Sequence, residues 1–147
     1  MPPDEVSIAF RKGAWLSSLG HHAAASNLYT QLVSRSEGLA DDDLYSEAMA
    51  CCAASWWQLH RSLGVADVDF CASMIEDAVA RGTGSVAEAR ALLTGAWIFS
   101  DGGRISDPRA IAFLQRAREI ITLHPVAEIR SELGLAIRMS RELVKGL

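Results

Sequence analysis

The chain has 147 residues, of which 50% are hydrophobic and 22% are charged, and its formal net charge is −4. This length allows one domain with a sizeable core, and the composition excludes a disordered chain. A negative chain without a Lys/Arg-rich run is not expected to bind nucleic acid or a membrane surface. The 3 cysteines do not make a disulfide framework, so we expect buried thiols in a reducing compartment.

The first residues carry neither the basic stretch nor the apolar stretch of a secretion signal. The longest stretch of low charge, residues 48–59, is too short to cross a bilayer. We therefore expect a cytoplasmic protein. Arginine far outnumbers lysine and alanine is abundant, which fits a GC-rich genome and a bacterial source.

Two helices are predicted at the start of the chain. The first covers about residues 4–18 and ends before Gly20, and the second covers about 22–36 and ends at Gly38. Their apolar residues recur at spacings of three and four, which is the period of a helix with one buried face.

The next two predicted helices cover residues 44–62 and 67–81. Three aspartates at 41–43 supply an N-cap and a negative first turn, which suits the positive end of the helix dipole. The helix over 44–62 is apolar on nearly every side, so we expect it in the middle of the fold.

Two capping signals place the last helices. Ser85 and Glu88 form a predicted capping box for a helix that reaches about Phe99, and Asp107 before Pro108 starts a helix to about Leu123. No alternating pattern of a strand is found, so the predicted fold class is all-α. The helices pair as about three antiparallel hairpins plus a closing helix in a single domain, over about residues 5–36, 43–81, 86–123 and 125–145.

A short motif recurs along the chain. The tetrapeptide Gly-Ala-Trp-Leu at 13–16 returns as Gly-Ala-Trp-Ile at 95–98, and a blurred copy, Ala-Ser-Trp-Trp, lies midway at 54–57. Self-similarity at a period of about forty residues indicates stacked helical hairpins. Such architectures usually hold another polypeptide.

The second helix of each hairpin also shares a pattern: a small residue, a large one four positions later, and a small or apolar one after three more. The small residue lets two helices approach closely, and the large one fills the space between hairpins. The three sets are Ala25, Tyr29 and Leu32; Cys71, Ile75 and Ala78; and Ala110, Leu114 and Ala117.

With these sets, Gly13, Leu16 and Gly20 resemble the small, large and turn positions of a tetratricopeptide repeat. The resemblance extends over most of residues 9–123, and it implies a right-handed α-solenoid of degenerate repeats. The second hairpin departs from the pattern at Trp57, among other positions. A generic helical bundle with an accidental repetition is the alternative.

In the family, the first helices of the hairpins line a concave groove that binds a partner. The lining implied here is small and apolar, which suits an extended segment or an amphipathic helix of a partner protein and an adaptor or chaperone role. It resembles, in that respect, the repeat-containing chaperones of bacterial secretion systems. The implied positions are Ser7, Phe10, Ala14 and Ser17; Ala48, Cys51, Ser55 and Gln58; and Ala89, Leu92, Ala96 and Phe99.

The tryptophans are expected to divide between core and surface. Trp15, Trp56 and Trp97 occupy the repeated position beside a small residue, which favours packing between hairpins. Trp57 is the extra one, and we expect it to be an exposed anchor for the partner.

Other interpretations stay open. The groove positions pack equally well against the closing helix or a second copy of the chain, so a self-associating structural or regulatory domain is the second hypothesis. A small α-helical enzyme is the third, although no nucleophile–base motif, phosphate loop or metal motif is visible. The adjacent pairs at 21–22 (His) and 51–52 (Cys) point in different directions on a helix, so we expect no metal and no cofactor.

Overall fold

The computed structural model describes residues 3–104 and 106–124, and within these ranges the chain is all-α, as predicted. The bounds of its helices are close to those expected from the sequence. The closing helix predicted over 125–145 lies outside the described residues. The six described helices are α1 (Pro3–Ser18), α2 (His22–Leu39), α3 (Asp42–Ser62), α4 (Val68–Arg81), α5 (Val86–Asp101) and α6 (Pro108–Leu123).

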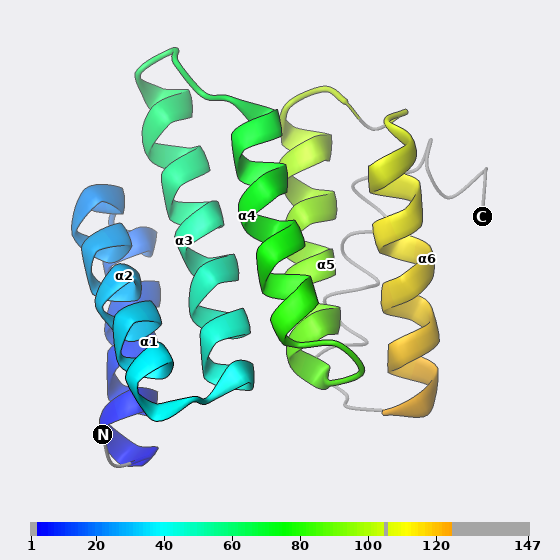
Figure 1. The fold of residues 1–147 in the computed structure, drawn as a ribbon. Helices are drawn as coiled ribbons and strands as arrows, with labels where there is room; N and C mark the ends of the chain where they lie inside the picture. The colour runs from blue at the N-terminus through cyan, green and yellow to red at the C-terminus, as the bar shows by residue number, and fades with distance from the viewer. Residues whose placement is uncertain (1–2, 105, 125–147) are drawn as a thin grey trace.

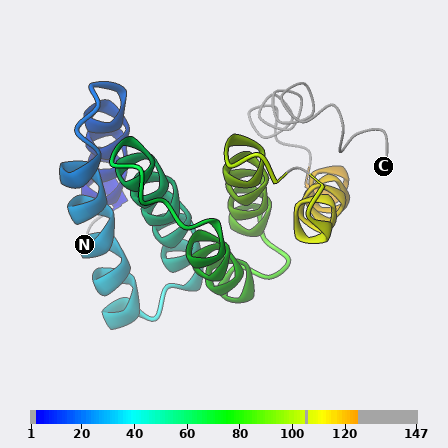
Figure 2. The same ribbon diagram turned by 90° about the horizontal axis from the view of Figure 1, so that it is seen from above.

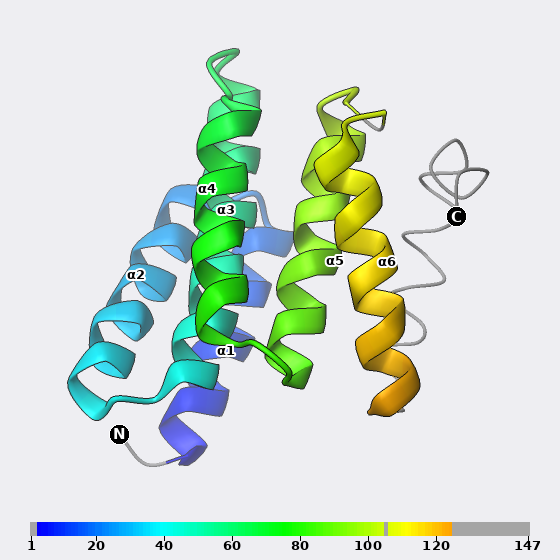
Figure 3. The same ribbon diagram turned by 45° about the vertical axis from the view of Figure 1, so that its right-hand side comes forward.

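Consecutive helices run in opposite directions and pack side by side (Figure 1). Seen from above, the hairpins follow one another from α1–α2 at one end to α5–α6 at the other (Figure 2). Each helix contacts its neighbours in the chain, and α3 also contacts α5. In Figure 3, α3 lies behind α4. The helix α3 therefore has α2, α4 and α5 as neighbours, which confirms its predicted place in the middle of the fold.

Aspartate side chains start two helices as predicted. Asp41 accepts a hydrogen bond from the Leu44 N–H at 3.0 Å. Asp107 accepts one from the Arg109 N–H at 2.9 Å, and Pro108 occupies the first turn of α6. Each aspartate satisfies an N–H group that has no partner within the helix.

The predicted end of the second helix is wrong by a few residues. Gly38 does not end α2, because α2 continues to Leu39. The left-handed residue is Ala40, with φ 51°, and the N–H of Asp41 donates to the carbonyl of Ser36 at 3.0 Å. This bond ends the helix. Ala40 therefore adopts the left-handed conformation that the sequence pattern had led us to expect at a glycine.

The predicted capping box at the start of α5 is also wrong. Ser85 Oγ donates to the carbonyl of Gly82 at 2.6 Å instead of capping the helix. Glu88 Oε1 accepts from the N–H of Gly84 at 2.7 Å, and Arg116 on α6 donates to Glu88 Oε2 at 3.1 Å. Glu88 therefore accepts a local hydrogen bond one residue earlier than predicted, and an ion pair to α6 also holds its side chain.

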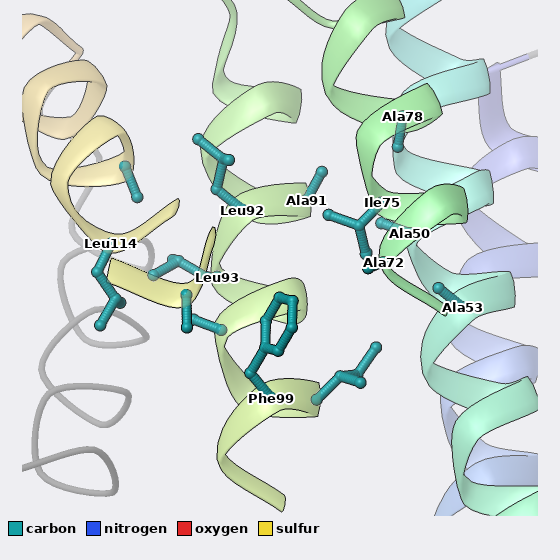
Figure 4. Packing of buried hydrophobic residues seen from close by; sticks show 14 of the residues in the cluster. Ala50, Ala53, Ala72, Ile75, Ala78, Ala91, Leu92, Leu93, Phe99 and Leu114 are labelled. Carbon is teal, nitrogen blue, oxygen red and sulfur yellow. The ribbon is translucent and has the colours of Figure 1, made fainter. Parts of the chain in front are cut away.

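Small residues form much of the core between α3, α4, α5 and α6. In Figure 4, Ala50, Ala53, Ala72 and Ala78 lie around Ile75, with Ala91 of α5 facing them. The larger side chains Leu92, Phe99 and Leu114 fill the space towards α6. All nine residues of the three small–large–small sets are buried, at most 5% exposed. The sequence pattern thus identified core positions correctly in the second helix of every hairpin.

Two glycines of the repeated motif lie where helices touch. A Cβ at Gly13 would come within 2.5 Å of the Tyr29 ring on α2. A Cβ at Gly95 would come within 2.7 Å of the Phe113 ring on α6 and 2.9 Å of Ile75 on α4. The glycine of each motif thus lies against an aromatic ring of its own hairpin, so the repetition has a physical basis.

We predict that Gly95→Ala lowers the free energy of unfolding by about 1–3 kcal/mol, because fully buried Ile75 cannot move aside for a new methyl group. Gly38→Ala is the matched control. A Cβ at Gly38 meets nothing within 4 Å in a helical backbone, so this change should stabilise by up to about 1 kcal/mol. Urea unfolding followed by circular dichroism measures both. Equal effects of the two substitutions would contradict the close approach at Gly95.

Candidate partner-binding face

Two half-exposed stripes run along α3 and α5, at helical spacings of three and four. Each stripe is one half-exposed side of its helix, and Met49 and Trp56 are half-exposed on another side of α3. We call the two stripes together the open face. It consists of Glu47, Cys51, Ala54 and Gln58 on α3, and Arg90, Thr94 and Trp97 on α5.

Ion pairs join the two helices at both ends of the open face. Arg90 donates to Glu47 at 3.1 Å near the start of each helix. At the other end, Arg61 of α3 lies 2.7 Å from Asp101 of α5. The indole N–H of Trp57 donates to the same carboxylate at 2.6 Å. Because the two helices run in the same direction, these contacts hold the stripes side by side along their length.

The open face carries a thiol and a carboxyl whose pKa values are raised by burial. Burial raises the pKa of the Cys51 thiol to about 12, helped by nearby Cys52 and Glu47. Burial also raises the pKa of the Glu47 carboxyl, and Arg90 offsets part of this effect. A thiol held in its protonated form is a poor nucleophile. The face therefore offers small neutral groups, one indole ring and paired charges.

Half of the groove positions expected on α3 belong to the open face. Cys51 and Gln58 are half-exposed. Ala48 and Ser55 are buried, with exposed fractions of 0% and 2%. Ala48 belongs to the core cluster that α3 shares with α2, which explains why a partner cannot reach it.

The groove positions expected on α5 are wrong as surface positions. Ala89, Leu92, Ala96 and Phe99 are all buried and all belong to the core cluster. The physical reason is the number of neighbours: α5 contacts α3, α4 and α6. The narrow stripe from Arg90 to Trp97 is partly exposed instead. Its residues lie one or two positions after the predicted ones.

The groove positions expected on α1 lie at the surface or at its border. Ser7 and Ala14 are exposed, and Phe10 and Ser17 are half-buried. The Phe10 ring lies 6.1 Å from the Tyr29 ring and packs on the cluster that Cys51 also borders. Phe10 and Cys51 thus border the same core cluster.

The expectation for the tryptophans is wrong at two positions. Trp57, expected to be an exposed anchor, is 4% exposed and its N–H bonds Asp101. Trp15, expected in the core, is 61% exposed. Trp56 and Trp97 are partly buried against the core cluster. The sequence gives no local signal for the buried indole of Trp57, because its acceptor Asp101 is 44 residues away.

A surface hollow of about 490 Å³ lies elsewhere, between α1 and α2. None of the predicted groove positions lines it. Its lining is Ala9, Leu28, Thr30, Gln31, Leu32, Ser34 and Arg35.

No metal or membrane feature emerges from the part of the chain that the structure describes. Over residues 3–104 and 106–124, His, Cys, Asp and Glu side chains do not gather in groups of three or more that could hold a metal ion. Over the same ranges, no helix combines the length and apolar character needed to cross a bilayer.

Comparison with family models, with curated proteins and with solved structures finds no match to this chain.

We predict that Asp101→Ala lowers the free energy of unfolding by about 1–3 kcal/mol, because the buried Trp57 N–H then has no acceptor. Asp101→Asn keeps an acceptor oxygen and is the matched control, so it should cost clearly less. Urea unfolding followed by tryptophan fluorescence gives both values. A loss as large in Asp101→Asn would show that the Arg61 ion pair, and not the indole bond, carries the effect.

Proposed function

We propose that the chain is a protein-interaction module that binds a segment of a partner protein along the open face. The observation that carries this proposal is the pair of half-exposed stripes on α3 and α5, which two ion pairs hold in register. An adaptor or chaperone role in the bacterial cytoplasm is the setting in which we expect this binding.

The side chains of the open face fit a helix or an extended segment. Cys51, Ala54 and Thr94 are small, so the backbone of a partner can approach closely. Trp97 offers a large apolar surface at one side, and aromatic residues of this kind contribute much of the energy of many interfaces. The charged groups at both ends are paired, so a partner that covers them would not leave an uncompensated charge.

The stacked hairpins support the same proposal. Three hairpins follow one another, and glycines at matching motif positions lie against aromatic rings in the first and third. We infer from this that the chain winds as a tetratricopeptide-like right-handed solenoid. In such stacks, each repeat contacts its neighbours and leaves an extended surface for a partner.

Self-association is the second candidate function. The observation that favours it is a group of exposed apolar side chains, Ile8 and Trp15 on α1 and Leu19 directly after it, none of which belongs to the open face. This surface does not compete with the open face, so both interactions can occur in one protein.

We predict that Ala54→Arg abolishes partner binding, because its long side chain lies across the centre of the open face. The partner is first captured from the host with the wild-type protein and identified by mass spectrometry. Its binding segment is then titrated by calorimetry, where we expect at least a 100-fold weaker affinity, about 3 kcal/mol.

Ala80→Arg is the matched control, since Ala80 is an exposed alanine on α4. It should bind the segment as the wild type does. Circular dichroism of both variants verifies that the helices are intact. Full binding by Ala54→Arg would refute the open face as the binding site.

A further inference from the structure

The Glu47 carboxylate lies in the contact between α3 and α5. Its side chain is 31% exposed, and Arg90 on α5 donates to it at 3.1 Å. In the part of the chain that the structure describes, Arg90 is the one side chain that donates to this carboxylate. At the other end of the open face, Asp101 accepts from two side chains, Arg61 and Trp57. The two ends of the open face are therefore held differently.

The surroundings of Glu47 disfavour its charged form. Burial removes water from the carboxylate, and this raises its pKa above the ordinary value. Arg90 offsets part of the effect. Asp43, one turn earlier on the same side of α3, and Asp41 at the N-cap raise the pKa further, because like charges repel. The ionised carboxylate is thus held in the contact at a cost that one proton would remove.

Other charged groups on the helices that pack against α3 act elsewhere. Arg35 of α2 lines the hollow between α1 and α2. Glu88 of α5 is buried and lies 3.1 Å from Arg116 of α6. Tyr45 lies two positions before Glu47, and therefore on roughly the opposite side of α3. The charged groups that act on Tyr45 are Asp77 and Arg81 of α4 and Glu37 of α2.

We propose that the pair of Glu47 and Arg90 is an acid-sensitive switch of the open face, which loosens the contact between α3 and α5 when Glu47 takes up a proton. A neutral carboxyl attracts a guanidinium much less than a carboxylate does. The stripes then lose one of the two ion pairs that keep them in register. This inference rests on the proposed function, because the switch acts on the same face: the partner segment binds more weakly in mild acid.

The titration of Glu47 in the free protein is the first test. Carbon-13 NMR of the full chain follows each glutamate carboxyl, and Glu47→Gln identifies the Glu47 signal by removing it. We expect this carboxyl to keep its proton to a higher pH than an ordinary exposed glutamate does. An ordinary titration of Glu47 overturns the switch without any need for a partner.

The stability of the free protein should follow the same titration. Because the pKa of Glu47 is raised on folding, its contribution to stability is present at low pH and is lost as the pH rises through the folded pKa. Urea unfolding should therefore show that the wild type gains stability relative to Glu47→Gln as the pH falls. A difference between the two proteins that does not change with pH contradicts the raised pKa.

Binding of the partner segment, captured with the wild type as above, is the second test. Glutamine is uncharged and has nearly the shape of a protonated glutamate, so Glu47→Gln mimics the acid form. Between neutral pH and the pH at which NMR shows Glu47 protonated, calorimetry should show the wild-type affinity falling about three- to tenfold. Glu47→Gln should bind with the weaker affinity already at neutral pH.

Glu76→Gln is the matched control, since Glu76 is an exposed glutamate of α4 and this change removes the same charge. It should follow the wild type at both pH values. Circular dichroism verifies that the helices are intact in every variant. If Ala54→Arg abolishes binding while Glu47→Gln keeps the affinity and pH dependence of the wild type, the open face binds the partner and the switch is refuted.

Discussion

The structure depends on the close approach of helices at small residues. Gly13 touches the Tyr29 ring, and Gly95 touches both Phe113 and Ile75, so a single methyl group would collide at either place. Alanines extend the same contact along α3, α4 and α5 (Figure 4). Because small residues fix where the helices meet, the large ones have defined spaces to fill. Packing at crystal-like density leaves little freedom in how the hairpins stack.

This close packing also determines which side chains stay exposed and can contact a partner. A helix with neighbours on three sides, such as α5, exposes only a narrow stripe. The stripe of α5 lies beside that of α3 because ion pairs join the two helices at their ends, through Arg90 at one end and Asp101 at the other. Asp101 also accepts the indole N–H of buried Trp57, so one carboxylate serves the core and the border of the open face.

The sequence was sufficient to predict the helices and the buried positions in the second helix of each hairpin. Caps such as Asp107 and the periodicity of apolar residues act within a few positions, so they can be read directly. Which neighbour covers a helix face is a long-range property, and the prediction failed there. The family resemblance placed Ala96 and Phe99 in an open groove, but it does not show how many helices surround α5. Trp57 failed for the same reason, since its partner lies far away in the chain.

The open face and the outer side of α1 are exposed for different reasons. The open face consists of residues left over after α3 and α5 acquired their neighbours, and its charges are already paired. The outer side of α1, where Ile8 and Trp15 are exposed, lies on the first hairpin, and α2 is the main described neighbour of this helix. A stack of repeats needs either a polar end or a covered one, because an apolar end continues to attract whatever buries it. Trp15 makes this end apolar. The hydrophobic effect that joins the hairpins inside the chain therefore also acts on this exposed side of α1.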